Sequence, residues 1–300
     1  MRWEDLPSSG NIEDRRSGGG FGGGMIPGGA GGLGIGSMVV LGLIGWALGI
    51  DPSILIGGAE VLNRGGGSSY QQPSAPAQTG TPNDQMGRFV SNVLGSTEVQ
   101  WKDIFEKAGA RYRAPRLVMF REATQSGCGF AQSAMGPFYC PTDQKIYLDT
   151  SFFRQIEQRF RGCSGKACQF AQAYVIAHEV GHHVQNQLGI LTKVQQLKQG
   201  VSKIEGNRLQ VRTELQADCF AGVWAKYSNQ KWNLLEPGDV EAALQTASAI
   251  GDDTLQRQAQ GRVVPDSFTH GSAEQRQRWF NRGLQDGTVQ SCNTFQAAQL

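Results

Sequence analysis

Hydrophobic positions divide the chain into one long uncharged stretch near the N-terminus and a series of amphipathic segments after it. Residues 17–50 carry no charge, and residues 33–50 are dense in Leu, Ile, Val and Trp. A helix needs about 20 apolar residues to cross a bilayer core, so the pattern predicts a single transmembrane anchor over residues 33–57. A cleaved signal peptide, whose apolar region is shorter, and a glycine-rich low-complexity tail are the alternatives.

The predicted anchor separates a polar and glycine-rich tail, residues 1–32, from the rest of the chain. Gly, Ser, Pro and Gln dominate residues 58–85, which predicts a flexible linker. Amphipathic patterns start at Met86, so we expect one folded domain over residues 86–300. Most of its apolar periods are helical, and one alternating stretch at residues 144–153 is rich in β-formers. The sequence therefore predicts an α+β domain that is predominantly helical, with a small antiparallel sheet.

All six cysteines follow the uncharged stretch, and an even number on one side of a membrane is typical of disulfides in an oxidising compartment. Many pairings are possible, and pairing between sequence neighbours predicts Cys128–Cys140, Cys163–Cys168 and Cys219–Cys292. The chain has no Cys-x-x-Cys, which argues against zinc bound by cysteines. We expect a single-pass membrane protein with a cytoplasmic N-terminus and an exported domain. A net charge of +2 and the lack of a long basic run argue against a nucleic-acid partner.

Three of the four histidines lie in the segment AHEVGHH, within a strongly apolar helical pattern. His178 and His182 are four residues apart, so both imidazoles lie on one helix face and reach the same ion. Glu179 is rotated by about 100°, where its carboxylate reaches a zinc-bound water as general base instead of binding the metal. Two core histidines satisfied by neighbouring polar groups are the alternative. His183 is expected to pack, not to bind the metal.

A catalytic zinc needs a third protein ligand. An H-E-x-x-H-x-x-G-x-x-H pattern would place a histidine at position 188, where this chain has Leu188. A later amphipathic segment, RLQVRTELQADCFAGVWAKYS, carries Glu214 and Asp218 four residues apart beside small side chains that allow helices to approach closely. We expect Glu214 to bind the zinc and Asp218 to accept a hydrogen bond from a ligating histidine. A solvated acidic face is the alternative.

The motif HEVGHH, followed later by ELQADCFAG, resembles the bacterial neutral zinc metallopeptidase family, a group of zincins with a glutamate as third ligand. The resemblance extends over nearly the whole chain, including the glycine-rich N-terminal part. It implies a zinc peptidase with a zincin-like domain, one Zn²⁺ per chain, and a protein or peptide as substrate. It also supports the roles predicted for His178, Glu179, His182, Glu214 and Asp218, and it names no substrate.

The fourth histidine, His270, comes just before a helix that a capping box at Ser272 begins and Gly287 ends. In related peptidases a similar histidine helps to hold the oxyanion of the tetrahedral intermediate. The resemblance implies this role for His270, with Arg276 as its support. A loop histidine that only packs is the alternative.

The alternating stretch at residues 144–153 is the candidate edge strand for an extended peptide substrate, with Tyr147 lining the groove and a helix following over residues 154–160. A core hairpin with the segment CGFAQSAMGPFYC is the alternative. The competing function is a zinc-stabilised binding or chaperone-like module with little or no hydrolytic activity. The presence of Glu179, which a scaffold does not need, favours the peptidase.

Overall fold

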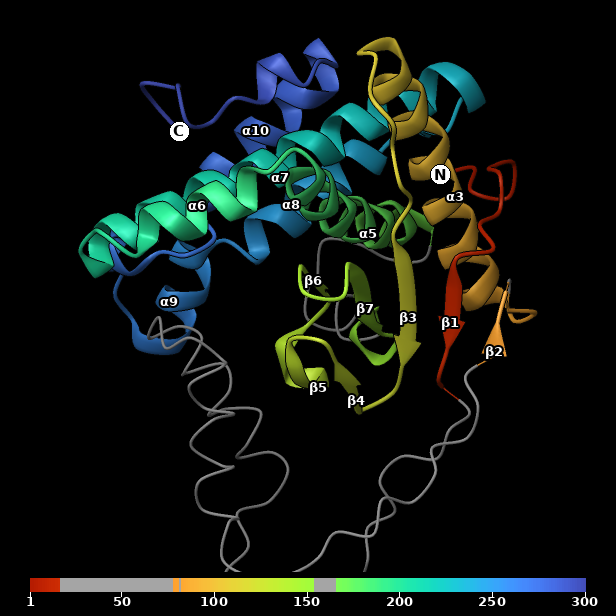
Figure 1. Ribbon diagram of the computed structural model, residues 1–300, viewed down its shortest axis with the longest axis horizontal. Coiled ribbons are helices and arrows are strands. Elements are labelled where there is room, and N and C mark those ends of the chain that lie inside the picture. Colours follow the sequence, from red (N-terminus) through yellow and green to blue (C-terminus); the bar gives the residue numbers. More distant parts are fainter. Residues whose placement is uncertain (17–77, 81, 154–165) are drawn as a thin grey trace, which may run out of the picture.

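The structure is a computed structural model, and it describes residues 1–16, 78–80, 82–153 and 166–300. Two long helices, α5 (Lys166–Gln187) and α7 (Lys203–Trp232), lie across the top of a small sheet in Figure 1. A third helix, α10 (Ala273–Asp286), packs on α7 on the side away from the sheet. The apolar surface of α5 continues around most of the helix, as is typical of a helix covered on all sides.

Five strands form the main sheet in the order β2-β1-β3-β7-β6. Their bounds are β1 Ile12–Asp14, β2 Gln78–Thr79, β3 Arg116–Phe120, β6 Phe138–Cys140 and β7 Lys145–Asp149. The three central strands are parallel, and the two edge strands β2 and β6 are antiparallel to their neighbours. The sheet is therefore mixed, and the expected antiparallel sheet is wrong. The unbroken apolar run Leu117–Phe120 is typical of a parallel strand that is buried on both faces.

Further helices surround this centre, and a hairpin of β4 (Ala123–Ser126) and β5 (Gly129–Gln132) lies beside the sheet. The helices are α3 Gln85–Lys107, α6 Ile190–Lys198, α8 Asp239–Ala249 and α9 Asp252–Gln260. Short 3₁₀ turns are η1 Ser133–Met135, η2 Pro265–Ser267 and η3 Gln290–Cys292. The prediction of a predominantly helical domain with a small sheet is confirmed.

The first residues of the chain belong to the folded domain. Trp3, Leu6 and Ile12 are buried in the main core, and β1 pairs with β3 inside the sheet. The expectation that residues 1–32 form a separate tail is therefore wrong for residues 1–16. Their few apolar side chains are too short a series to show a periodic pattern, and their partners lie far away in sequence.

The predicted linker also contributes to the sheet, because β2 pairs with β1 and Asp84 caps the start of α3. The guanidinium of Arg16 forms an ion pair with Asp84 at 2.5 Å, so residues 16 and 84 lie side by side. The predicted anchor, residues 33–57, and the helix expected over residues 154–160 lie outside the described residues. None of the helices within the described ranges combines the length and the hydropathy that a membrane crossing requires.

Two of the predicted disulfides are confirmed. Cys128–Cys140 joins the β4–β5 hairpin to β6, and Cys219–Cys292 joins α7 to η3. The third predicted pair includes Cys163, which lies outside the described residues. Because β6 is an edge strand only three residues long, the first of these bonds helps to fix its position.

Helices α7 and α10 cross at two glycines. A Cβ atom at Gly222 would overlap the carbonyl oxygen of Phe280, and one at Gly283 would overlap the carbonyl oxygen of Cys219. Only glycine permits this approach, which brings α10 against the part of α7 that carries Glu214 and Asp218.

Substituting Gly222 by alanine is expected to lower the free energy of unfolding by about 1–3 kcal/mol, because the added methyl group forces two packed helices apart. Thermal and urea unfolding measure the change. Gly200→Ala is the matched control, since a Cβ atom there meets nothing within 4 Å. If the two variants were equally stable, the close crossing of α7 and α10 would be incorrect.

Candidate metal centre

Three predicted ligands converge between α5 and α7. The Nε2 atoms of His178 and His182 each lie 3.2 Å from the same atom, Oε2 of Glu214. Bonds of 2.0–2.1 Å to a tetrahedral zinc place neighbouring ligand atoms about 3.3 Å apart. Within the described residues, these three side chains form the group of potential metal ligands, with ligand atoms within 4.8 Å of one another. The donor set and its spacing fit zinc.

The glycine within HEVGH lets the two helices approach. A Cβ atom at Gly181 would lie 3.0 Å from the carbonyl oxygen of Ala217 and 3.1 Å from its Cα atom. The small residues expected to allow a close approach therefore divide between two partners. Ala217 faces α5, whereas Gly222 faces α10. The first contact brings Glu214 within reach of both histidines.

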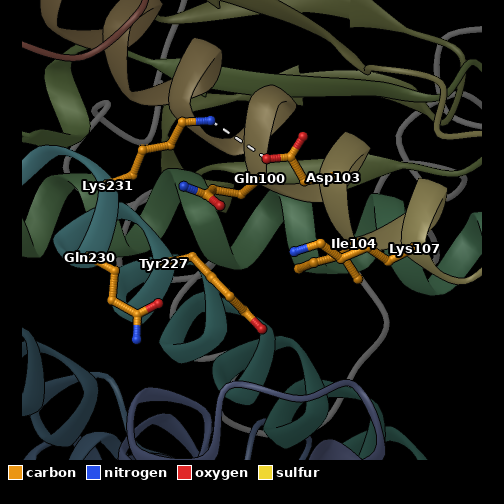
Figure 2. Close-up of a pocket in the computed structure, with 7 residues that line it drawn as sticks. All are labelled: Gln100, Asp103, Ile104, Lys107, Tyr227, Gln230 and Lys231. Atoms are coloured by element: carbon orange, nitrogen blue, oxygen red, sulfur yellow. Dashed lines mark ion pairs between the residues drawn. The ribbon is translucent and has the colours of Figure 1, made fainter.

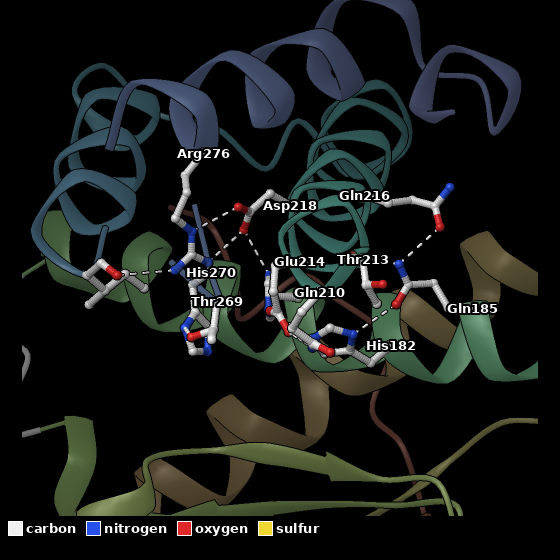
Figure 3. A network of polar contacts seen from close by, with 12 residues as sticks. His182, Gln185, Gln210, Thr213, Glu214, Gln216, Asp218, Thr269, His270 and Arg276 are labelled. Atoms are coloured by element: carbon white, nitrogen blue, oxygen red, sulfur yellow. Dashed lines mark hydrogen bonds and ion pairs between the residues drawn. The ribbon is translucent and has the colours of Figure 1, made fainter. Parts of the chain in front are cut away.

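Each ligand is held by a second polar side chain, as is usual in metal sites. The Nδ1 atom of His178 lies 2.8 Å from Asp218, as expected for an acceptor that fixes the histidine tautomer. His182 donates from Nδ1 to Gln185 at 2.9 Å, and Gln210 donates to the free oxygen of Glu214 at 2.9 Å. Figure 3 shows these contacts.

Sequence reasoning missed both glutamines. Gln185 stands where the H-E-x-x-H-x-x-G-x-x-H pattern has its glycine, and its spacing of three from His182 places it on the same helix face. Gln210 has the corresponding spacing of four from Glu214. Gln185 is itself fixed, because its amide donates to the carbonyl oxygen of Thr213 and to Gln216. A glutamine three or four residues from a predicted ligand is the sequence signal that could have identified them.

Asp218 is fully buried and forms the centre of a polar network (Figure 3). It accepts hydrogen bonds from Nε and Nη2 of Arg276, both at 2.9 Å, and from the hydroxyl of Tyr174. Arg276, expected to support His270, directs its guanidinium to the buried carboxylate of Asp218 on α7, which holds the predicted ligand His178. Burial opposes ionisation, but Arg276 and His178 outweigh it and lower the pKa of Asp218 to about 2.

His270 lies close enough to the centre for its charge to contribute to the lowered pKa of Glu214. Its position depends on Asp252, the first residue of α9. One oxygen of Asp252 accepts the backbone N–H groups of Thr269 and His270 at 2.6 Å and that of Gly271 at 3.1 Å. The other oxygen lies 3.4 Å from Nδ1 of His270. A carboxylate thus fixes both the loop and the imidazole.

Glu179 is buried beside the ligands and is not one of them. Burial raises its pKa, while the neighbouring His178 and His182 and a backbone hydrogen bond from Tyr139 act in the opposite direction. Tyr139 belongs to β6, so the edge of the sheet lies directly against the carboxylate of Glu179, the predicted general base.

The carboxylates of the centre favour a positive charge at the ligand positions. Burial alone would lower the pKa of His178, but Asp218 and Glu214 outweigh it and raise the pKa to about 10. Burial likewise opposes the ionised form of Glu214, and the two ligand histidines hold its pKa well below the usual value. A metal ion that binds here must displace protons from the imidazoles, so its affinity is expected to rise with pH.

His183 packs away from the centre, as expected. Its Nε2 atom lies 2.6 Å from the carbonyl oxygen of Arg113, and its ring meets Tyr112 and Tyr139 edge-on. Burial lowers its pKa, which is consistent with a neutral imidazole. Through Tyr139 this histidine fixes β6 against α5.

Tyr147 cannot line a substrate groove. Its side chain is 1% exposed, donates a hydrogen bond to Asp143 at 2.6 Å, and stacks on Phe138. It points to the face of the sheet covered by the β4–β5 hairpin, opposite the face that packs on α5. The strand β7 itself lies between β3 and β6, so it is not an edge strand. Both parts of that prediction are wrong, and β6 is the edge next to the metal centre.

A separate cavity of about 250 Å³ lies between α3 and the C-terminal part of α7 (Figure 2). Gln100, Asp103 and Lys231 are among its lining residues, and none of the predicted metal ligands is. Asp103 and Lys231 form an exposed ion pair at 3.5 Å across it. The cavity is therefore distinct from the metal centre.

The family model described as "Putative neutral zinc metallopeptidase" matches residues 1–295. The chain belongs to this family. It is 49% identical to "Uncharacterized protein YpfJ" of Escherichia coli K12, over 98% of this chain and 99% of the relative. It is 45% identical to "Uncharacterized protein Rv2575" of Mycobacterium tuberculosis H37Rv, over 68% of this chain and 69% of the relative. No solved structure matches the chain.

Family membership confirms the resemblance seen in the motifs and implies zinc as the metal and peptides as substrates. The match starts at residue 1, in agreement with the burial of the N-terminal residues in the domain. Membership does not assign the individual residues, whose roles depend on the geometry described above.

Proposed function

We propose that this chain is a zinc-dependent peptidase that hydrolyses peptide bonds at the centre formed by His178, His182 and Glu214. The observation that carries the proposal is the convergence of both Nε2 atoms on one oxygen of Glu214, with the carboxylate of Glu179 buried beside them. A binding module stabilised by zinc would need the three ligands. It would not need the buried carboxylate of Glu179, which is not one of those ligands.

A bound zinc ion supplies Lewis acidity and lowers the pKa of a water molecule beside it. Glu179 accepts a proton from that water and later delivers it to the leaving amine. Burial raises the pKa of Glu179, which makes its carboxylate a stronger base for this exchange. Asp218 and Gln185 hold the two histidines in orientation throughout.

The edge strand β6 is the surface on which we place the peptide substrate. An extended peptide adds to an open sheet edge through main-chain hydrogen bonds, which give affinity without strong sequence selection. Tyr139 on β6 contacts Glu179, so a peptide paired with β6 would pass the base. This arrangement replaces the strand at residues 144–153 as the substrate edge.

Membrane attachment through residues 33–57 is also proposed, on the basis of their apolar composition. The fold restricts its topology. Residues 1–16 and the metal centre belong to one folded body, so both lie on the same side of any membrane. A single crossing of the bilayer by residues 33–57 would put residues 1–16 and the metal centre on opposite sides, so it is not part of this proposal. Disulfides favour the extracytoplasmic side of the bacterial inner membrane, which a C-terminal reporter fusion tests.

The proposed activity is tested with the full chain loaded with one zinc ion and a peptide library of broad composition. Cleavage that a chelator abolishes and zinc restores is the expected result. If the zinc-loaded protein cleaved no peptide yet bound peptides tightly, the binding or chaperone-like function would be correct instead. Mass spectrometry of the products distinguishes internal cleavage from removal of terminal residues.

His270→Ala is expected to lower turnover by about 10²-fold without loss of zinc, because an imidazole beside the centre can stabilise charge that develops on the substrate. Asp252→Asn should lower turnover less, since it removes the charge that holds His270 but keeps the loop hydrogen bonds. Asp253→Asn is the matched control, because the carboxylate of Asp253 accepts the backbone N–H of Ala273, at the start of α10. A loss of less than tenfold in His270→Ala would exclude a role in the transition state.

A further inference from the structure

Two segments of the chain that contact each other carry basic side chains and no carboxylates. Residues 107–121 contain five basic side chains, and residues 186–204 contain three. Neither segment contains an aspartate or a glutamate. The basic residues are Lys107, Arg111, Arg113, Arg116, Arg121, Lys193, Lys198 and Lys203.

The two segments are joined at the end of α5. The side chain of Gln187 accepts the backbone N–H of Arg113 and donates to its carbonyl oxygen, both at 2.9 Å. The loop after α3 and the start of α6 therefore form one continuous surface. Arg111, Arg113 and Lys193 are exposed on it.

The second of these segments also exposes large hydrophobic side chains. Within the described residues six such side chains are exposed, and four of them lie between residues 188 and 204. Leu188 is 44% exposed, Leu197 46%, Val201 44% and Ile204 43%. Single exposed hydrophobic residues need no explanation, but a group of four in 17 residues marks an interaction site.

Three of these four side chains form the tip of a helical hairpin. Leu197 lies in the last turn of α6, Val201 lies between the helices, and Ile204 lies in the first turn of α7, so we call residues 197–204 the hairpin tip. In Figure 1 the tip forms the left end of the molecule, far from the sheet. Because the tip projects from the molecule, it is better suited to inserting into a membrane surface than to binding a peptide in a groove.

The carboxylates nearest to the tip are already engaged. Glu205 accepts Arg208 at 2.5 Å, and Asp266 lies 3.6 Å from the same guanidinium. The ammonium groups of Lys193 and Lys203 have no ion-pair partner within the described part of the chain. Exposed apolar side chains flanked by unpaired lysines are typical of helices that lie in the interface of an anionic membrane.

We propose that the hairpin tip inserts its apolar side chains into the surface of a bilayer that contains anionic lipids, with Lys193 and Lys203 beside the lipid headgroups. Each lysine near such a surface strengthens binding about fivefold. This contact is independent of the proposed peptidase activity and of residues 33–57. It would hold the metal centre in a fixed orientation relative to the membrane.

A probe placed at the tip tests the proposal in the full chain. Leu197→Cys is labelled with a fluorophore whose emission shifts to the blue in an apolar environment, and vesicles of phosphatidylcholine with or without phosphatidylglycerol are added. Lys102→Cys on α3, an exposed position outside this surface, is the matched control. A local probe separates contact at the tip from any binding by residues 33–57.

A blue shift at position 197 only with phosphatidylglycerol, and none at position 102, supports the proposal. Lys193→Glu with Lys203→Glu should weaken the response at least about 25-fold in lipid concentration, and high salt should also weaken it. Peptidase activity should not change, because neither lysine contacts the metal centre. No shift with either vesicle, or an equal shift at both positions, would overturn the proposal. A shift caused by an acidic protein but not by vesicles would assign the surface to a protein partner.

Discussion

Glu179→Gln is expected to lower the turnover of peptide hydrolysis about 10²–10⁴-fold, while the protein keeps its zinc. Glutamine has the size of glutamate but cannot accept the proton, and Glu179 is not among the three converging ligands. Metal content by mass spectrometry and turnover of a cleaved library peptide measure the two effects separately. Unchanged turnover would remove Glu179 from the mechanism.

Two further variants serve as controls for zinc content and for activity. Glu214→Gln should lose zinc and activity together, because it replaces an oxygen on which both histidines converge. Glu106→Gln, on an exposed glutamate of α3, should change neither quantity. If Glu179→Gln lost its zinc as Glu214→Gln does, Glu179 would be a structural part of the site, and the assignment of the base would be wrong.

Asp218→Asn is expected to produce the second large effect, on stability and on metal affinity at once. The substitution leaves the guanidinium of Arg276 buried without its carboxylate, which costs about 3–5 kcal/mol of unfolding free energy. It also removes the acceptor of His178, which should weaken zinc binding about 10–100-fold. Urea unfolding and zinc competition with a chelator measure the two losses.

A second substitution separates the two roles. Adding Arg276→Met to Asp218→Asn removes the unpaired cation, so part of the stability should return while zinc affinity stays low. Arg278→Met is the control on the same helix, and because Arg278 is half exposed its loss should cost no more than about 0.5 kcal/mol. If the double variant regained zinc affinity, Asp218 would not act through His178.

The stability from Asp218 has a defined pH dependence. Its folded pKa, about 2, lies below that of an ordinary aspartate because Arg276 and His178 outweigh burial. The contribution is therefore complete above the unfolded pKa and is lost as the pH falls towards about 2. Across the neutral range this carboxylate remains ionised, which its role as acceptor for His178 requires.

The sequence alone determined those features that depend on spacing within one helix or on a short loop. His178, Glu179 and His182 are related by the helical repeat, and so are Glu214 and Asp218. The capping box at Ser272 and the disulfide Cys128–Cys140 are similarly local. Spacing of this kind survives in any fold that keeps the helix, so it could be predicted before the fold was known.

Only the tertiary structure decided which separate elements meet. Arg276 reaches Asp218 because two glycines let α10 cross α7 closely. No sequence pattern in either helix predicts that these two residues meet. Tyr147 is buried because its side of β7 is covered by the β4–β5 hairpin, and β6 is the edge strand because β7 pairs on both sides. Residues 1–16 complete the sheet through partners about 100 positions away, a contact that local periodicity does not encode.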